Sequence, residues 1–303
     1  MPIRHQAFVF RLEPDEAQAT LFAQSAGCCR YAYNRCLDLK SEAWKKDGKS
    51  LSFPDLCGFL PAWKKAPETA WLSEVPSQIL QQSIKDLCSA FKNFFEGRAD
   101  YPTHKKKGKA RDSFRFPQGV ALDPISRRIT LPKIGTMKYR KSREIQGRIK
   151  SATVYRQGEH WHVSVLTERD VPKPLTKATA SAGIDAGVAN FLTLDSGERI
   201  APINAFKSFM DRIAKIQRKM ARQVKYSKNW QKEKAKLQRL HLKAANVRKD
   251  FLHKTSHKLC NSHAAIFAED LDIQKMAASP SADRKSTRLN SSHLKLSRMP
   301  SSA

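Results

Sequence analysis

The sequence has no long apolar run. Hydrophobic residues make up 40% of the 303, and no uninterrupted stretch approaches the roughly 20 apolar residues that a membrane-spanning helix needs. The N-terminus includes Arg4 and His5 within its first few residues, so it has no apolar core of a secretory signal. The length is enough for about two domains with hydrophobic cores. These features predict a soluble protein of a reducing cytoplasm.

The sequence also has no Cys-x-x-Cys pair. A zinc ribbon needs two such pairs, so the spacing excludes one in this chain, and it gives no sign of a disulfide framework. We therefore expect buried free thiols. The six cysteines are Cys28, Cys29, Cys36, Cys57, Cys88 and Cys260.

Acidic residues are few beside the basic ones. There are 28 Asp and Glu residues against 56 Lys and Arg, which gives a formal net charge of +28. Such an excess is far beyond what solubility requires, and a polyanion is the natural partner. Residues 206–259 hold 17 basic and three acidic residues, a net of +14, so the positive charge is concentrated there.

The last residues, 283–303, differ from the rest of the chain. They resemble one reading frame of a short-read sequencing adapter with an index region between its two halves, and we expect them to be a disordered artefact. They carry five basic residues and one acidic residue, so the remaining chain keeps a charge of +24. We expect the natural chain to have been cut near Ala282.

Helical patterns fill most of the first hundred residues. Residues 7–12 alternate as a short strand, and Asp15 with Gln18 three positions later is a capping box that starts a helix. We expect this helix to end at Gly27 and a second to follow it. Apolar residues at near-helical spacing predict a further helix over 77–95.

Alternating segments replace the helical pattern after residue 110. Glycine, proline and aspartate turns separate them at short spacing, which is typical of a small β-barrel or an antiparallel sheet. A linker follows over 173–181. The predicted strands are 113–116, 128–131, 137–139, 149–155 and 160–166.

Two acidic residues stand out in the last third of the chain. Asp185 lies inside an apolar strand that begins near Ala182, and Glu269 follows a second strand of buried type over 264–268. An unpaired carboxylate in such a place is costly unless a cation compensates it, and oxygen ligands suit Mg²⁺. Between the two strands, residues 206–259 predict a basic helical hairpin with its turn near 226–229. Such a hairpin could hold nucleic acid beside the metal.

Other basic residues are candidates for nucleic-acid contacts. The lysines of the segment 104–109 flank Tyr101, Phe114 and Phe116, whose rings could stack on bases or belong to the core. Trp230 could stack on a base or pack in the hairpin, and packing is the simpler interpretation. The candidate contact residues are Lys105, Lys106, Lys107, Lys109, Arg218, Lys219, Arg222, Lys225, Arg239, Lys243 and Arg248.

Several of these pieces together resemble the TnpB/OrfB proteins of bacterial insertion sequences. The matching segments, in the family's order, are 8–12, 30–34, 113–116, 131–135, 183–188 and 268–271. The resemblance implies an RNA-guided, metal-dependent DNA endonuclease related to type V CRISPR effectors, with DNA and guide RNA as partners. A companion transposase is a further partner that it suggests. It also implies that Asp185 and Glu269 are catalytic acids that bind two Mg²⁺ ions.

The implied fold class is a multidomain α+β protein. Residues 1–12 would be the first strand of a wedge-like β-barrel, 13–110 an inserted helical recognition lobe and 111–172 the rest of the barrel. After the linker, residues 182–282 would form an incomplete RNase H-like (RuvC) domain that includes the basic hairpin.

The sequence departs from the family's pattern in one respect. The family's third catalytic acid and its zinc ribbon follow the second acid, and this chain has neither, so we expect little or no nuclease activity from it. The alternative is a non-catalytic nucleic-acid-binding regulator of transposition. The two hypotheses differ in one expectation: cleavage by the nuclease should need Mg²⁺ and Asp185, whereas nucleic-acid binding by the regulator should need neither. A basic ribosome-associated protein explains the charge but not the two acids.

Overall fold

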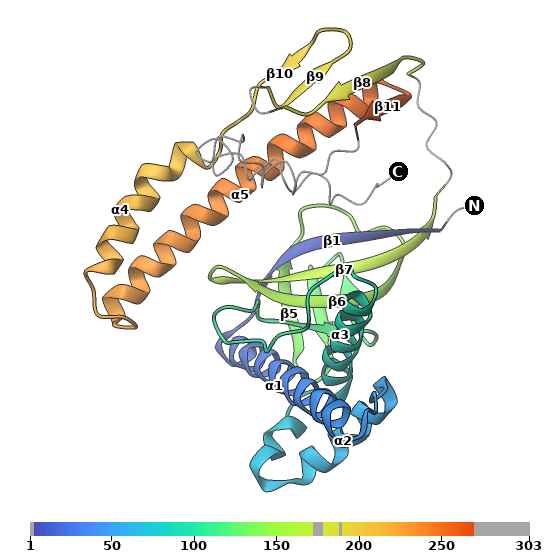
Figure 1. Cartoon of the computed structure of the whole chain (residues 1–303), viewed down its shortest axis with the longest axis vertical. Coiled ribbons are helices and arrows are strands. Elements are labelled where there is room, and N and C mark those ends of the chain that lie inside the picture. The colour runs from blue at the N-terminus through green and yellow to red at the C-terminus, as the bar shows by residue number, and fades with distance from the viewer. Residues whose placement is uncertain (1–2, 172–177, 188–189, 270–303) are drawn as a thin grey trace. The chain divides into compact units, whose positions relative to one another are not determined.

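The structure is a computed structural model that describes residues 3–171, 178–187 and 190–269 (Figure 1). The chain divides into two compact units, residues 1–173 and 174–303, which are described separately below. Most of the predicted linker and the whole predicted artefact, 283–303, lie outside the described residues. Within those residues, no helix combines the length and the apolar character needed to cross a bilayer.

The first unit begins with strand β1 and then has three α-helices. They are α1 (Glu16–Asp47), α2 (Phe53–Lys65) and α3 (Ser77–Phe95), with a short 3-10 helix at Pro67–Ser73. The range of α3 is the one predicted. The interruption predicted at Gly27 is wrong, because α1 continues through it. Buried side chains such as Phe22, Cys29 and Leu37 lie on both sides of this glycine, so packing of the whole helix outweighs its low helix propensity.

The two ends of α1 are capped. Gln18 N donates to Asp15 Oδ1 at 2.7 Å, and Asp15 N donates to Gln18 Oε1 at 3.2 Å, so the predicted capping box is confirmed. At the other end Gly48 has φ +62°, a left-handed conformation that glycine adopts at low cost, and its N–H bonds to Trp44 O at 3.0 Å.

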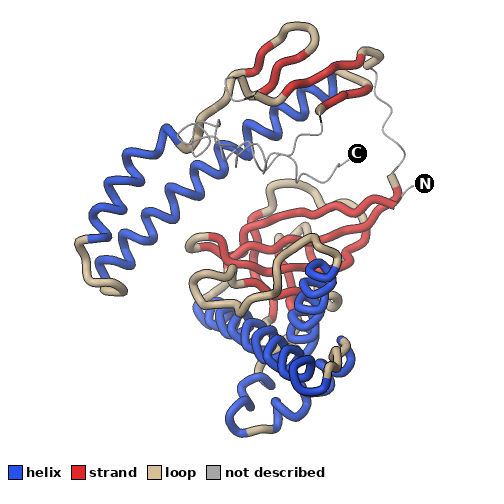
Figure 2. Tube along the Cα trace, in the orientation of Figure 1, coloured by secondary structure: helices blue, strands red, loops and turns tan. Residues whose placement is uncertain are grey.

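A seven-stranded antiparallel sheet makes up the rest of the first unit (Figure 2). Its spatial order is β2-β6-β7-β1-β5-β4-β3, so the N-terminal strand lies in the middle. Within the described residues no pairing joins β2 to β3. The antiparallel sheet is therefore confirmed, whereas the closed β-barrel that the family resemblance implied is not shown by these pairings. The strands are β1 (Ile3–Glu13), β2 (Ser113–Phe116), β3 (Ala121–Asp123), β4 (Arg128–Leu131), β5 (Gly135–Arg140), β6 (Arg148–Gln157) and β7 (His160–Asp170).

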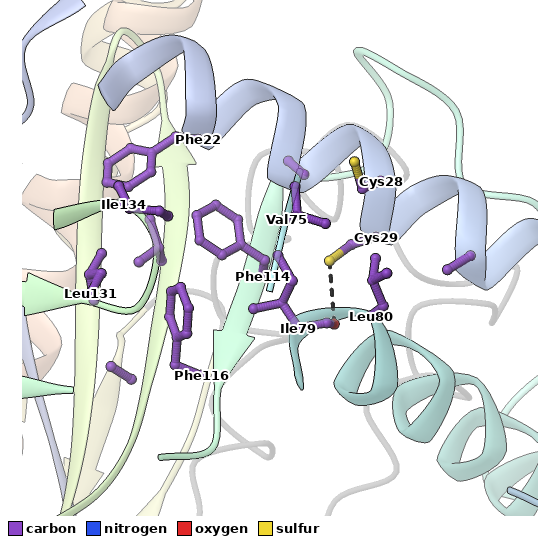
Figure 3. Close-up of a cluster of buried hydrophobic side chains, with 14 of the residues drawn as sticks. Phe22, Cys28, Cys29, Val75, Ile79, Leu80, Phe114, Phe116, Leu131 and Ile134 are labelled. Carbon is purple, nitrogen blue, oxygen red and sulfur yellow. Dashed lines mark hydrogen bonds between the residues drawn. The ribbon is translucent and has the colours of Figure 1, made fainter. Parts of the chain in front are cut away.

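Aromatic residues join the helices to this sheet. The ring of Phe22 in α1 lies 5.7 Å from that of Phe114 in β2 and 5.1 Å from that of Trp161 in β7, measured between centroids. Phe116 is fully buried beside them (Figure 3). Phe114 and Phe116 therefore belong to the core, and the interpretation of these two rings as base-stacking platforms is wrong.

The second unit combines a small sheet with two long helices. Its four strands are arranged in the order β10-β9-β8-β11, with β11 parallel to β8 and the other pairs antiparallel. Phe191, Leu192, Leu194 and Leu259 form its small buried cluster. The elements are β8 (Ser181–Asp185), β9 (Leu192–Leu194), β10 (Arg199–Ile200), a 3-10 turn (Lys207–Phe209), α4 (Met210–Ala221), α5 (Lys228–Ser262) and β11 (Ala265–Ala268).

Two details of the second unit differ from the prediction. The hairpin turn spans 222–227 and so overlaps only the first half of the predicted 226–229, because Ser227 already caps α5 by accepting from Trp230 N at 3.2 Å. Strand β11, predicted to be buried, is mostly exposed, and Phe267 keeps 66% of its surface. The reason is its place in the sheet: it is an edge strand among the described residues, and pairing with β8 covers only one of its sides.

Gly147 offers a test of the turn that leads into β6. Its φ is +89°, and a Cβ there would lie 2.6 Å from the carbonyl oxygen of Glu168. We expect Gly147→Ala to destabilise the first unit by about 3 kcal/mol or more, because a left-handed alanine and a backbone clash both contribute. Gly97→Ala is the matched control, with φ +68° and nothing near its Cβ, and about 1 kcal/mol is expected. Urea denaturation measures both; equal losses would contradict the clash.

Candidate functional site

Asp185 and Glu269 lie at the same end of two neighbouring parallel strands. Asp185 is the last residue of β8, and Glu269 directly follows β11. The register pairs Ile184 with Ala268, so the next position on each strand is an acid. Adjacent strands are about 4.8 Å apart, which puts the two backbones within reach of a shared ligand. Both residues are exposed to solvent.

Asp195 supports β8 from the other side. Its carboxylate oxygen Oδ2 accepts from Gly183 N at 2.8 Å, and its own N–H donates to Gly183 O at 3.0 Å. A Cβ on Gly183 would lie 3.5 Å from that carboxylate oxygen. Asp195 was not singled out from the sequence. The available signal was the glycine inside a strand, which often marks a close approach.

The helical hairpin α4–α5 carries the densest positive charge. Of the seven candidate contacts on it and its turn, six are exposed, and Arg248 is half-buried. Lys215, Arg218 and Arg222 line a shallow depression along α4. An exposed row of cations on one helix suits contacts to a phosphate backbone, which set position rather than sequence preference.

An ion pair between a buried carboxylate and a largely exposed lysine holds the two helices of the hairpin together. Glu233 of α5 is 6% exposed and accepts from Lys219 Nζ of α4 at 2.8 Å and from Lys236 Nζ at 3.0 Å. Lys219 was predicted as a nucleic-acid contact, and the structure gives it this bond within the hairpin. Nearby, Trp230 packs edge-on against Tyr226 at 5.4 Å between centroids.

The second basic region is the segment 101–112 between α3 and β2, which we call the basic loop. Its backbone is fixed at Lys105, whose N–H donates to Asn34 Oδ1 at 2.8 Å and whose carbonyl oxygen accepts from Asn34 Nδ2 at 3.0 Å. Arg30 pairs with Asp112 at 2.8 Å. Arg30 and Asn34 belong to the segment on which the TnpB/OrfB resemblance depends, and the structure gives them this anchoring role.

Further contacts continue along the same face of α1. Asp38 bonds to His104 Nε2 at 2.7 Å, and the hydroxyl of Ser41 bonds to that of Tyr101 at 2.8 Å. Together with Arg30 and Asn34, these residues recur at helical spacing, so one face of α1 holds the whole basic loop.

The four lysines of the basic loop have different surroundings. Lys106, Lys107 and Lys109 are exposed, as phosphate contacts must be. Lys105 is half-buried, with Nζ 3.9 Å from the centre of the Tyr33 ring, and burial lowers its pKa. The loop therefore presents three cations to solvent and directs one inward.

The cysteines agree only in part with the prediction of buried free thiols. All six are free, but only Cys28, Cys29 and Cys36 are buried, whereas Cys57 and Cys88 are half-buried and Cys260 is exposed. Burial raises the pKa of Cys28 to about 11 and that of Cys36 to about 12, so these thiols stay protonated and act as packing groups.

Comparison with known proteins identifies the class of the fold. A chain of the "Cryo-EM structure of the Cas12f1-sgRNA-target DNA complex" is similar with a TM-score of 0.51 at 14% identity, over 85% of this chain and 66% of that one. The two share a mixed fold of helices and antiparallel sheets.

Sequence comparison identifies the family. The OrfB_IS605 profile, "Probable transposase", matches residues 162–279. The "Putative RNA-guided DNA endonuclease InsQ" of Escherichia coli (strain K12) is 44% identical over 91% of this chain and 68% of its own length. A "Putative RNA-guided DNA endonuclease" of Streptomyces pristinaespiralis is 35% identical, covering 89% and 68%. The chain belongs to the TnpB/OrfB family and spans about two thirds of the length of these relatives.

A second profile, "Helix-turn-helix domain", matches residues 1–49. The structure there is one strand, β1, and one uninterrupted helix, α1. The sequence match therefore records common descent within the family rather than two helices joined by a turn in this segment.

The Glu233 ion pair predicts that the hairpin is sensitive to acid. Hydrogen bonds from Lys219 and then Lys236 lower the pKa of Glu233 below its ordinary value of 4.5. Its contribution to stability is thus present above that value and is lost as the pH falls through the lowered pKa. We expect the protection factors of the α4 and α5 amides, that is, exchange relative to the intrinsic rate at each pH, to fall at acid pH, and Glu233→Gln to lower them already at neutral pH.

The control for this prediction is Asp250→Asn. Asp250 pairs with Lys254 at 2.8 Å on the same helix, but both side chains are exposed, so solvent screens the pair. We expect little change in exchange. An acid sensitivity that persists unchanged in Glu233→Gln would show that another group is responsible.

Proposed function

We propose that this chain acts in transposon-encoded, RNA-guided recognition of DNA, with the metal centre of the endonuclease formed around Asp185 and Glu269. The observation that carries the proposal is the parallel register of β8 and β11, which brings the two acids to adjacent strand ends. In parallel α/β sheets, ligands bind at this end of the strands. A RuvC-type, RNase H-like arrangement for the second unit and a wedge-like role for the first are parts of the same proposal.

The two carboxylates fit part of a magnesium site. They are hard oxygen donors, both are accessible, and neighbouring strands hold them at the same level. Within the ranges that the structure describes, no third His, Cys, Asp or Glu joins them in a group of three. When bound, a divalent cation supplies Lewis-acid stabilisation of a reacting phosphate. Asp185 and Glu269 would hold it, and Asp195 would keep β8 in place.

The partners that this proposal includes are DNA and a guide RNA. The printed names of the relatives describe RNA-guided DNA endonucleases, and the similar fold was solved with a single guide RNA and target DNA. In this chain the exposed cations of α4–α5 and of the basic loop are the surfaces that suit phosphate backbones. The companion transposase stays a prediction from the family resemblance.

Metal binding tests the proposed centre directly. We expect Mn²⁺, used as a probe in calorimetry, to bind this chain. Asp185→Asn or Glu269→Gln should weaken Mn²⁺ binding at least about tenfold, because even substitutions of residues that only support a metal ligand cause a loss of that size. Asp211→Asn is the control, because Asp211 is an exposed acid of α4 outside the site. Equal affinities in all three variants would contradict the site.

Cleavage distinguishes the two functions considered. Any DNA cleavage by this chain with a guide RNA should require Mg²⁺ and disappear in Asp185→Ala, while salt-dependent nucleic-acid binding persists. Cleavage that survives in Asp185→Ala would show that the metal centre is elsewhere. If the affinity for nucleic acid is unaffected by Mg²⁺ and by this substitution, and no cleavage occurs under any condition, the result would favour the non-catalytic regulator.

A further inference from the structure

A cavity of about 240 Å³ lies in the first unit, between α1, α3, the basic loop and β2. Three of its lining residues, Cys29, Ile79 and Phe114, are almost fully buried members of the hydrophobic core, so the cavity ends against that core. Figure 3 labels these three side chains within the core cluster. Two others, Asp86 and Arg111, are exposed, so the cavity reaches the surface. A space of this size, below that of most drug-sized ligand pockets, suits one small unit of a larger ligand.

The wall of the cavity is strongly basic. Four cationic residues line it: Arg30, Lys105, Arg111 and Arg115. Asp86 is the acid of the lining, and Asp112 lies just outside it, paired with Arg30. The four cationic residues outnumber the acidic ones even when Asp86 and Asp112 are both counted. The cavity therefore suits a ligand that carries negative charge.

Contacts within the fold hold these cations in place. The guanidinium of Arg111 lies 3.5 Å from the centre of the Tyr155 ring, and Arg115 Nη2 lies 3.3 Å from Ser151 Oγ. Lys105 is fixed through its backbone by α1 and through its ammonium group by an aromatic ring, as described above. A site whose charges are ordered before binding loses less entropy when the ligand arrives.

Asp86 restricts the chemistry of the ligand further. A site for a phosphate group alone needs only donors and cations, and a carboxylate in it would repel the ligand. Although Asp86 is exposed as a residue, partial desolvation of its carboxyl group raises the pKa, while Lys105 and Arg115 act in the opposite direction. Since a carboxylate is an acceptor only, a ligand that satisfies the whole lining carries an anionic group and an N–H donor. A nucleotide with an amino group on its base has both.

We propose that this cavity binds one unpaired nucleotide of a nucleic-acid strand, with its phosphate at Lys105 and Arg111 and the amino group of its base at Asp86. The inference rests on the nucleic-acid-binding part of the proposed function and adds a site in the first unit that is separate from the metal centre. Bases with an amino group, such as cytosine, should bind better than uracil.

Fluorescence anisotropy on the full chain without divalent metal tests the proposal. The probes are oligocytidylate, oligouridylate and an abasic oligonucleotide of the same length. We expect oligocytidylate to bind roughly fivefold to tenfold more tightly than the other two, the size of one base contact. Asp86→Ala, which removes the acceptor oxygens, should remove the preference for cytosine over uracil, and Arg111→Gln should weaken binding of all three probes.

The control variant is Asp100→Asn, which removes the same charge at an exposed position of the segment between α3 and the basic loop. It should keep the wild-type preference. Thermal unfolding shows whether each variant is folded, and if Asp86→Ala is not, the base preference of the wild-type chain still tests the proposal.

Three results would overturn the inference. Equal affinity for all three probes would mean that the chain reads phosphate alone. A preference for cytosine that survives in Asp86→Ala would place the base contact elsewhere. Absence of binding to every probe would overturn this inference and the nucleic-acid-binding part of the proposed function together, whereas failure of the cavity alone leaves salt-dependent binding intact.

Discussion

The parallel pairing of β8 with β11 is the constraint on which the second unit depends. Two parallel neighbours cannot be joined by a tight turn. The chain between them must return to the end of the sheet at which the first strand began. Here that return contains β9, β10 and the long helices α4 and α5. The same pairing sets the register that puts Asp185 and Glu269 side by side and makes the connection long enough to carry a basic hairpin.

The first unit depends in a similar way on α1. One side of this helix buries Phe22, Cys29 and Leu37 in the core, and a polar side holds the basic loop through Arg30, Asn34 and other residues at helical spacing. The loop has no helix or strand of its own, so its shape comes from these side-chain contacts. A single long helix thus links the aromatic core to the cations that nucleic acid would meet. The cavity beneath the loop is a consequence of this arrangement.

The basic residues of the two units differ in how many of their side chains are exposed to solvent. On α4–α5 most of the cations face solvent. The buried Glu233 of α5 pairs with Lys219 of α4, which joins the two helices, and with Lys236 of its own helix. In the basic loop, Lys105 turns inward while its neighbours remain outside. The count of basic residues therefore overstates the number available to a polyanion, and only the positions of the side chains separate the two groups.

The sequence by itself determined the elements whose signals are local. The capping box at Asp15 and Gln18, the apolar spacing of α3 and the alternation of β2 and β4 each depend on nearby residues, and the structure confirms them. The continuation of α1 past Gly27 was not predictable in this way, because packing against α3 and the sheet stabilises it. For the same reason the composition could not say whether Phe114 and Phe116 stack on bases or fill the core.

Only the tertiary structure decided how the functional groups are arranged. The sequence identified Asp185 and Glu269 as chemically unusual, but their adjacency comes from a pairing between strands some eighty positions apart, and no local pattern encodes it. The roles of Asn34 and Asp195 as anchors, and the meeting of Asp86 with Lys105 and Arg111 in one cavity, are likewise long-range. Local propensity is set by neighbours along the chain, whereas a site is set by residues that folding brings together.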